Sequence, residues 1–364
     1  MGKKIIIAGG GTGGHIFPAI AIANAIKKLA PDTMFLFIGA FGKMEMEKVP
    51  QAGYEIEGLD IAGFNRSNIF KNISLPLKLI RSFWKVRKLV NQFQPDAVIG
   101  VGGYSTFPVL RYAQQKGIPT FIHEANSFAG KSNMLLGARA TKIFVATAGM
   151  EKFFPPDKLM ITGNPVRKSI AGIAVSKEAA LESFKLEKNK TTILVMGGSL
   201  GAKSINDVIA AHVHEFISLD IQLIWQTGKN NAMAYKERGK VFSNIWVDTF
   251  ITDMDKAYAA ADIIVSRAGA MSVAEICVVK KPAIFVPYPH AAEDHQTVNA
   301  MHLVNRGAAL MVKDQDAVKE LFSKMVALAK SNNEQQGLIE KIKPLGITNA
   351  DEVVATEILN TIGD

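Results

Sequence analysis

Residues 3–14 read KKIIIAGGGTGG, a short apolar run followed by six residues of which five are glycine. The apolar run predicts a buried strand, and a helical pattern extends from residue 18 to about residue 29. Pro18 suits the first turn of that helix, because the N–H that proline lacks would have no partner there. A strand, a glycine turn and a helix in this order are typical of a doubly wound α/β sheet.

The second half of the chain begins in the same way. Residues 191–196 read TTILVM and lead into the turn GGSLG at residues 197–201 and a second helical pattern. Strand-like and helical segments alternate in both halves, which predicts parallel sheets with helices on both faces. At 364 residues the chain suits two domains. We therefore expect an α/β protein of two Rossmann-like domains facing a central cleft, residues 1–163 and 164–348, with a helix at 349–364 that packs back on the first domain.

Composition limits the location and the partners. A formal net charge of +9 and a pI of about 9.4 favour an anionic partner, either a membrane surface or a phosphorylated substrate. No nucleic-acid motif accompanies the charge, so nucleic acid is not the expected partner. The single cysteine, Cys277, is typical of a reducing compartment. No apolar run is long enough to span a bilayer, so we expect a cytoplasmic protein that touches a membrane without crossing it.

The two glycine turns are candidate anion sites, because glycine lets the backbone and a helix N-terminus approach a phosphate. The first turn satisfies GxGxxG, but the next strand ends in Gly39-Ala40, without the acidic ribose anchor of a dinucleotide site. The second is a near miss to a Walker A loop, with Ala202 in place of a glycine. A pair of such turns facing one cleft suits a diphosphate sugar; the alternative for each is a tight turn without a ligand.

Several strings in the correct order closely resemble the MurG-type family of glycosyltransferases. They are GTGGHIFP at 11–18, GGYS at 102–105, HEAN at 123–126, GNPVR at 163–167, GGSLGA at 197–202, RAGAMSVAE at 267–275 and DHQ at 294–296. The resemblance covers essentially the whole chain.

This resemblance implies a GT-B fold and an inverting transfer of N-acetylglucosamine from its UDP donor. The acceptor would be the C4 hydroxyl of the N-acetylmuramoyl unit of undecaprenyl-diphosphate-linked pentapeptide, so that lipid I becomes lipid II in peptidoglycan synthesis. The first domain would hold the acceptor and meet the membrane, and the second would bind the donor. The resemblance also implies a peripheral position at the cytoplasmic face of the inner membrane, other cell-wall enzymes as partners, and no cofactor.

The residues carried over from the family fall into two groups. The implied donor contacts are Thr12, Gly13, Gly14, Asn126, Arg167, Ser199, Ile251, Ala270, Met271, Ser272, Val273, Ala274, Glu275 and Gln296. The implied acceptor contacts are Gly103, Tyr104, Ser105 and His123.

An inverting transfer needs a base for the acceptor hydroxyl and donors for the departing diphosphate. His15 is the first candidate base, because a neutral imidazole accepts a proton near neutral pH; the alternatives are phosphate or acceptor contact. Glu124 is the rival base, with a structural role as its alternative. Glu275 suits the ribose hydroxyls and Arg167 the diphosphate.

No metal is expected. His290, Glu293, Asp294 and His295 match no spacing typical of a zinc site, and backbone dipoles with Arg167 can neutralise a diphosphate. Rival functions that share this fold are a different GT-B transferase and UDP-N-acetylglucosamine 2-epimerase; a non-enzymatic nucleotide-sugar sensor is a third.

The segment 69–93 combines large apolar residues with many cations. The apolar residues expected to enter a bilayer are Ile69, Phe70, Leu75, Leu79, Phe83 and Trp84. A helix of this composition suits the plane of an anionic membrane; the alternative is a core stripe with a solvated cationic face.

Overall fold

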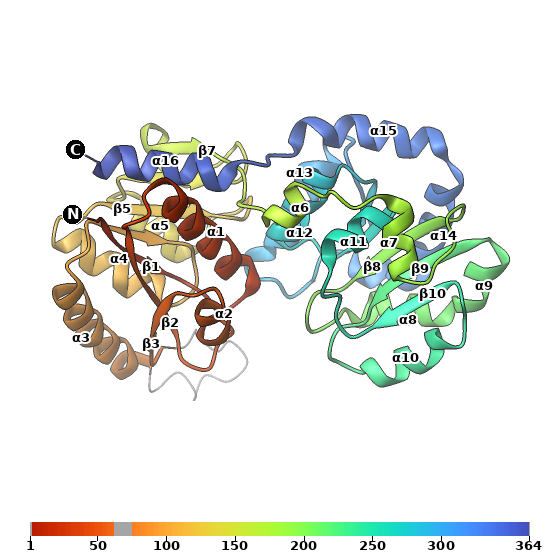
Figure 1. The fold of residues 1–364 in the computed structure, drawn as a ribbon, viewed down its shortest axis with the longest axis horizontal. Coiled ribbons are helices and arrows are strands. Elements are labelled where there is room, and N and C mark those ends of the chain that lie inside the picture. Colours follow the sequence, from red (N-terminus) through yellow and green to blue (C-terminus); the bar gives the residue numbers. More distant parts are fainter. Residues whose placement is uncertain (1, 62–74, 364) are drawn as a thin grey trace. The chain divides into compact units, whose positions relative to one another are not determined.

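The computed structural model describes residues 2–61 and 75–363. Its contacts divide the chain into two compact units (Figure 1). Unit 1 comprises residues 1–166 and 349–364, and unit 2 comprises residues 167–348. The boundary thus falls three residues after the one predicted from the sequence.

The described part of unit 1 contains a seven-stranded sheet in which every neighbouring pair is parallel. In spatial order the strands are β3 (Glu55–Leu59), β2 (Met34–Ala40), β1 (Lys4–Ala8), β4 (Ala97–Gly100), β5 (Thr120–Glu124), β6 (Lys142–Val145) and β7 (Leu159–Ile161). The order reverses beside β1, from which the chain goes first to β2 and later to β4. Ligands of open parallel sheets bind at the carboxyl ends of strands beside such a reversal.

Helices cover both faces of this sheet. They are α1 (Gly13–Leu29), α2 (Glu45–Gln51), α3 (Leu75–Phe93), α4 (Thr106–Gln115), α5 (Lys131–Gly137) and α16 (Ala350–Ile362). Alternate residues of β1 serve the two faces, as strand geometry requires. Ile5 and Ile7 pack with α1 and α16, whereas Ile6 and Ala8 pack with α3, α4 and α5. Strands buried on both faces explain why KIIIA is an unbroken apolar run.

The helix α1 begins five residues earlier than the sequence pattern predicts. It starts at Gly13, so Pro18 lies inside the helix and not in its first turn. Because the helix starts at Gly13, His15 lies in the first turn, next to the glycine turn.

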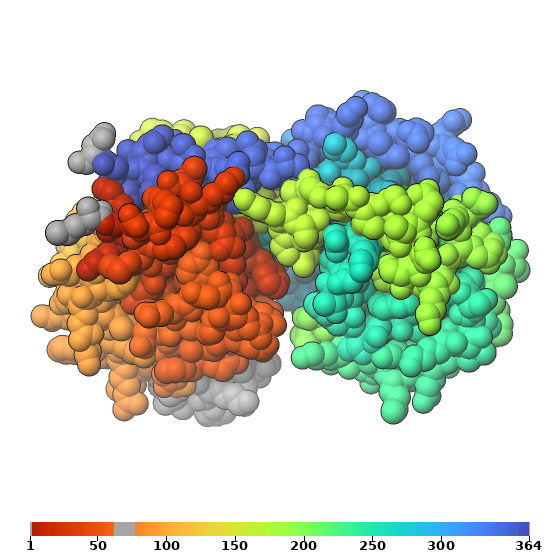
Figure 2. Space-filling view, in the orientation of Figure 1, coloured from red at the N-terminus to blue at the C-terminus, as the bar shows by residue number. Residues whose placement is uncertain are grey.

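The last helix, α16, belongs to unit 1. Its residues lie against those of α1, as the blue and red atoms of the space-filling view show (Figure 2). Val354 and Ile358 are fully buried in the cluster that contains Ile5. Lys28 pairs with Glu352 at 3.2 Å, and Lys142 pairs with Glu357.

Unit 2 contains a six-stranded parallel sheet within the residues described. In spatial order its strands are β10 (Ile245–Asp248), β9 (Ile221–Gln226), β8 (Thr191–Met196), β11 (Ile263–Ser266), β12 (Ala283–Phe285) and β13 (Leu310–Met311). Its helices are α6 (Lys168–Ala171), α7 (Lys177–Ser183), α8 (Lys203–Ala211), α9 (Val213–Ser218), α10 (Ala232–Lys240), α11 (Met254–Ala260), α12 (Ala270–Val279), α13 (His295–Val304), α14 (Ala317–Lys330) and α15 (Asn332–Ile342). The order again reverses, beside β8, the strand that precedes the second glycine turn.

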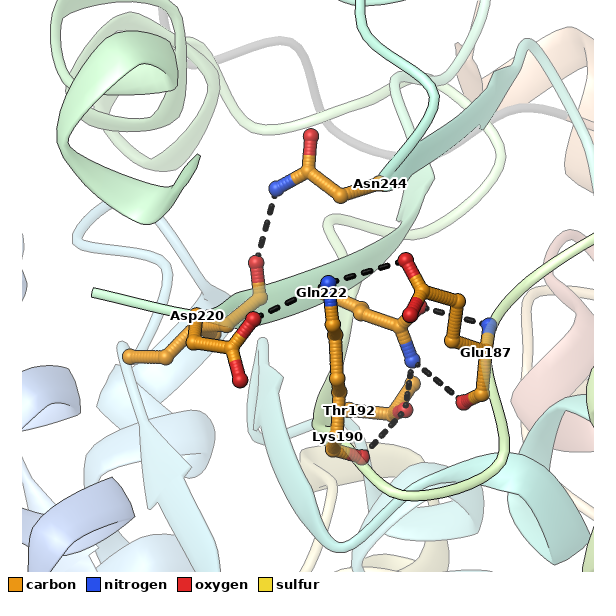
Figure 3. A network of polar contacts seen from close by, with 7 residues as sticks. Glu187, Lys190, Thr192, Asp220, Gln222 and Asn244 are labelled. Atoms are coloured by element: carbon orange, nitrogen blue, oxygen red, sulfur yellow. Dashed lines mark hydrogen bonds and ion pairs between the residues drawn. The ribbon is translucent and has the colours of Figure 1, made fainter. Parts of the chain in front are cut away.

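A buried glutamine near the amino end of β9 connects this second sheet to the loop before β8 (Figure 3). The Gln222 side chain is fully buried; its Oε1 accepts from the Glu187 N–H at 2.7 Å, and its Nε2 donates to the Glu187 carbonyl at 2.9 Å. The same Nε2 donates to Thr192 Oγ1 at 3.2 Å. One side chain thus satisfies both polar groups of a loop residue.

Replacing Gln222 with leucine should lower the free energy of unfolding by roughly 2–4 kcal/mol, because three hydrogen bonds that contribute about 0.5–1.5 kcal/mol each are lost. Urea unfolding measures the loss. Lys190→Ala is the matched control at the same edge: it removes only exposed ion pairs with Glu187 and Asp220 and should cost less than about 1 kcal/mol. Equal stability of Gln222→Leu and wild type would contradict the role given to this network.

Candidate active site

The turns after β1 and β4 meet at the carboxyl ends of the strands of the first sheet. The Gly10 N–H donates to the Gly102 carbonyl at 3.1 Å. A Cβ at Gly103 would lie 2.4 Å from the Gly10 oxygen, so only glycine fits there. The structure therefore brings the GTGG and GGYS strings together, although about 90 residues separate them.

His15 lies over this junction. Its Nδ1 is 2.9 Å from the Gly10 carbonyl oxygen. A carbonyl oxygen only accepts, so Nδ1 carries the proton and the Nε2 of a neutral ring keeps its lone pair. Nε2 lies against Gly102, where a Cβ would be 2.8 Å away. This is the tautomer that a base acting through Nε2 requires.

Glu124, the rival base, is fully engaged inside unit 1. Its Oε1 accepts from the Asn126 N–H at 3.1 Å and from Asn126 Nδ2 at 3.3 Å. Its Oε2 accepts from the Gly130 N–H at 3.0 Å and from Asn133 Nδ2 at 2.9 Å. Four donors leave little capacity to take a substrate proton, so the geometry favours an organising role in the loop after β5.

The predicted acceptor contacts differ in accessibility. Tyr104 is exposed, whereas the side chains of Ser105 and His123 are buried in this structure. Burial lowers the pKa of His123 to about 4; the Gly163 carbonyl opposes this effect and nearby His15 adds to it. His123 is therefore neutral at physiological pH.

The lowered pKa of His123 predicts a pH dependence of stability. The His123 ring resists protonation in the folded state, whereas it accepts a proton near pH 6.5 in the unfolded state. The free energy of unfolding is therefore at its full value above pH 6.5 as far as this group is concerned, and it decreases as the pH falls toward 4. The loss attributable to His123 should be about 3 kcal/mol, at about 1.4 kcal/mol per pKa unit.

Urea unfolding of wild type and His123→Leu between pH 4 and pH 7 measures this contribution. The variant should show the flatter profile, whereas a leucine at exposed His290 in unit 2 should leave the profile unchanged. Parallel profiles of wild type and His123→Leu would refute the buried neutral state.

In unit 2, Gln226 at the end of β9 joins two loops at the carboxyl edge of the sheet. Its Nε2 donates to the Gly198 carbonyl at 3.3 Å, and its Oε1 accepts from the Ile251 N–H at 3.0 Å. Two predicted donor contacts, exposed Ser199 and buried Ile251, therefore lie on loops that one side chain connects.

Arg167 and Glu275, predicted to bind the diphosphate and the ribose, contact each other. Arg167 Nε and Nη2 donate to Glu275 Oε1 at 3.0 and 2.9 Å. The other oxygen, Oε2, accepts from the hydroxyl of fully buried Tyr258 at 3.0 Å. Burial raises the pKa of Glu275, and Arg167 opposes the rise.

The remaining predicted donor contacts lie at the start of α12 and at Gln296. Ala270, Met271, Ser272, Val273 and Ala274 form the first half of α12, which follows the end of β11. Gln296 Oε1 accepts from the N–H groups of Ala268 at 3.2 Å and Tyr288 at 3.0 Å. Thr12, Gly13 and Gly14 lie at the start of α1 in unit 1.

Sequence reasoning missed Arg267. Its guanidinium donates to the Val286 and Pro287 carbonyls at 2.9 and 3.0 Å and to Asp314 at 2.5 Å. It thereby fixes the loop after β12 beside Gln296. An arginine directly after a buried strand is the only local signal for this role, and its carbonyl partners are not readable from the sequence.

Two further predictions concern the lack of a metal site and the contact of segment 69–93 with a membrane. Within residues 2–61 and 75–363, no three His, Cys, Asp or Glu side chains group to hold a metal ion. In the same residues no helix is long and apolar enough to cross a bilayer. Ile69 and Phe70 lie outside the described residues; Leu75 begins α3, Leu79 and Trp84 are exposed, and Phe83 is half-buried.

Comparison with known proteins gives a consistent result. Residues 5–145 match the glycosyltransferase family 28 N-terminal domain, and residues 192–353 match the C-terminal domain of that family. A UDP-N-acetylglucosamine–N-acetylmuramyl-(pentapeptide) pyrophosphoryl-undecaprenol N-acetylglucosamine transferase of Bacteroides fragilis is 48% identical over 361 residues, covering 98% of this chain and 95% of the relative.

Two solved structures extend the comparison. The crystal structure of Acinetobacter baumannii MurG has a TM-score of 0.79 at 28% identity and covers 98% of this chain and 99% of that one. The UDP-N-acetylglucosamine 2-epimerase of Neisseria meningitidis, bound to its nucleotide sugar, has a TM-score of 0.67 at 16% identity, with 98% and 100% coverage. At that identity the epimerase shares the fold alone.

Proposed function

The chain belongs to glycosyltransferase family 28 and, within it, to the MurG-type N-acetylglucosamine transferases, and from this membership we infer that it is an enzyme of peptidoglycan synthesis. It transfers N-acetylglucosamine from UDP-N-acetylglucosamine to the N-acetylmuramoyl unit of the polyprenyl-diphosphate-linked pentapeptide. The observation that carries this conclusion is the 48% identity over nearly the whole of both chains.

His15 is the base of this reaction in our proposal. Its Nδ1 proton is directed to Gly10, which leaves Nε2 to accept the proton of the acceptor C4 hydroxyl. The hydroxyl oxygen bonds to the sugar C1 from the face opposite the diphosphate, and the C1–O bond to UDP breaks, which inverts C1. Engagement of Glu124 by four donors removes the main argument for that residue as the base.

The donor binds unit 2 through Arg167 and Glu275 in this proposal. The two side chains neutralise each other in the structure, and each has the chemistry of one part of the donor: a guanidinium for the diphosphate and a carboxylate for the ribose hydroxyls. Donor binding would therefore exchange this ion pair for two contacts with the ligand, while Tyr258 keeps Glu275 in place.

Turnover of purified lipid I tests the function, and two variants separate the roles. His15→Gln should lower kcat by roughly 10²–10⁴-fold with donor affinity within a few-fold, as expected for a lost base.

Arg167→Ala should weaken UDP-N-acetylglucosamine binding by roughly 1.5–3 kcal/mol in calorimetry, the value of a hydrogen bond to a charged group. Lys168→Ala, at the exposed neighbouring position, is the matched control.

Conversion of the donor without any acceptor would contradict the transferase function. Weak donor binding with normal kcat in His15→Gln would instead assign His15 to the phosphate.

The exposed face of α3 supports docking on an anionic membrane. Leu77, Ile80 and Trp84 are 62%, 55% and 67% exposed, and their spacing places them on one side of the helix. The opposite side, with Val86 and Val90, packs in the core of unit 1. The exposed cations of the helix are Arg81, Arg87 and Lys88. A polyprenyl-linked acceptor requires the enzyme at a bilayer surface, which we propose is the cytoplasmic face of the inner membrane.

The structure changes which residues should be mutated. Phe83 is half-buried, and Lys78 and Lys85 are paired with Asp60 and Glu57 at 2.9 and 2.7 Å. The informative variant is therefore Ile80→Ser with Trp84→Ser.

This double variant should lose binding to anionic vesicles in sedimentation and should turn over a long-chain acceptor more slowly than a short, water-soluble one. The wild-type binding should weaken with salt, since each headgroup-facing cation contributes about 1 kcal/mol. A double serine variant of exposed Met233 and Val318 in unit 2 is the matched control. Wild-type protein that ignores anionic vesicles at low salt would disprove the docking surface.

A further inference from the structure

A buried carboxylate lies directly beneath the first glycine turn. Glu45, the first residue of α2, has no exposed surface. Its Oε2 accepts from the Gly11 N–H at 2.8 Å, and its Oε1 accepts from the Ala40 N–H at 3.0 Å. The acid therefore links the turn after β1 to the end of β2.

Two glycines make the space for this carboxylate. A Cβ at Gly10 would lie 2.3 Å from Glu45 Cδ, and a Cβ at Gly39 would lie 2.5 Å from Glu45 Cγ. In a dinucleotide-binding fold, an acid at the end of the second strand binds the ligand. Here Glu45 of α2 reaches the end of β2, but its carboxylate is buried and accepts from Gly11, so the protein itself supplies an anion to the glycine turn.

One peptide group connects Glu45 to His15. The Gly11 N–H that donates to Glu45 and the Gly10 carbonyl that accepts from His15 Nδ1 belong to the same planar amide. Hydrogen bonds in series polarise one another, so a carboxylate on the N–H makes the carbonyl a stronger acceptor. The Thr12 hydroxyl, 3.5 Å from the same Nδ1, is too distant to compete.

We propose that Glu45 is a positioning residue that acts through the Gly10–Gly11 peptide to hold the proton of His15 on Nδ1. The arrangement keeps the Nε2 lone pair toward the acceptor and stabilises the imidazolium that forms when Nε2 takes the hydroxyl proton. A base oriented by a third group is a recurrent arrangement in enzymes; here an amide transmits the effect. The inference rests on the proposed role of His15 as the base.

Nitrogen NMR of protein labelled with ¹⁵N-histidine tests the proposal directly. At neutral pH the wild-type His15 ring should show a protonated Nδ1 and an unprotonated Nε2, with its signals identified by their loss in His15→Gln. In Glu45→Gln the same signals should move toward a mixture of tautomers, because an amide cannot accept from both backbone groups.

Asp96→Asn is the matched control for the loss of a backbone-holding carboxylate. Asp96 Oδ2 accepts from the Lys4 N–H at 2.7 Å, at the opposite end of β1 from the site. This variant should leave the His15 signals unchanged. If Glu45→Gln fails to fold, Glu45→Asp retains the charge but withdraws it from Gly11, and a smaller shift in the same direction is expected.

Kinetics provide the second readout. Glu45→Gln should lower kcat roughly 10–100-fold, less than the 10²–10⁴-fold loss of the base itself, with donor affinity nearly unchanged. Added to His15→Gln, it should lower kcat little further, because a residue that acts through His15 has no effect without it. A purely structural role would lower kcat by the same factor in both backgrounds.

The outcomes separate this proposal from the proposed function. A wild-type His15 protonated on Nε2, or signals that stay the same in both Glu45 variants, would overturn the role of Glu45. A tautomer that shifts in Glu45→Gln supports that role even if His15→Gln retains kcat; in that case the assignment of His15 as the base fails.

Discussion

No side chain larger than hydrogen fits where the turn after β1 meets the turn after β4. The Gly10 and Gly103 backbones touch, and the His15 ring lies over Gly102. Because of this close approach, three segments distant in sequence meet at one edge: the start of α1, the start of α2 and the loop before α4. The Gly10 carbonyl that orients His15 and the Gly11 N–H that donates to Glu45 both lie in this first turn.

Unit 2 solves a different electrostatic problem. The donor site that we propose in unit 2 needs a cation for the diphosphate and an acceptor for the ribose, and both are costly to bury alone. Arg167 and Glu275 neutralise each other, and Tyr258, whose pKa burial raises well above its usual value, stays protonated and donates to the carboxylate. The pair thus has no net charge in this structure, and the Tyr258 bond to Glu275 does not depend on Arg167.

The fold was readable from the sequence because its signals are local. Apolar runs such as KIIIA and TTILVM mark strands buried on both faces, and each glycine turn follows its strand directly. Helix starts were less accurate, since Pro18 suggested a first turn near residue 18 whereas α1 begins at Gly13.

Glu45 had no local signal: its partners are backbone N–H groups, one of them 34 residues away. Likewise, the sequence could not tell whether Glu124 is a base or a structural acid, because the four donors around it are visible only in the structure. The exposed stripe on α3 was partly readable, but which apolar residues face outward depended on the packing of Val86 and Val90.

The return of α16 to unit 1 affects the order in which the protein is made. Val354, Ala355 and Ile358 complete the cluster around Ile5 and Ile7, yet the ribosome adds them only after all of unit 2. Domains usually fold as they emerge, the N-terminal one first. Here the unit that is synthesised first has an uncovered apolar face on α1 until α16 is made, while the continuous unit 2 can complete its core beforehand. The nascent first unit is therefore the species that most needs protection from aggregation, and removal of α16 would leave it permanently in that state.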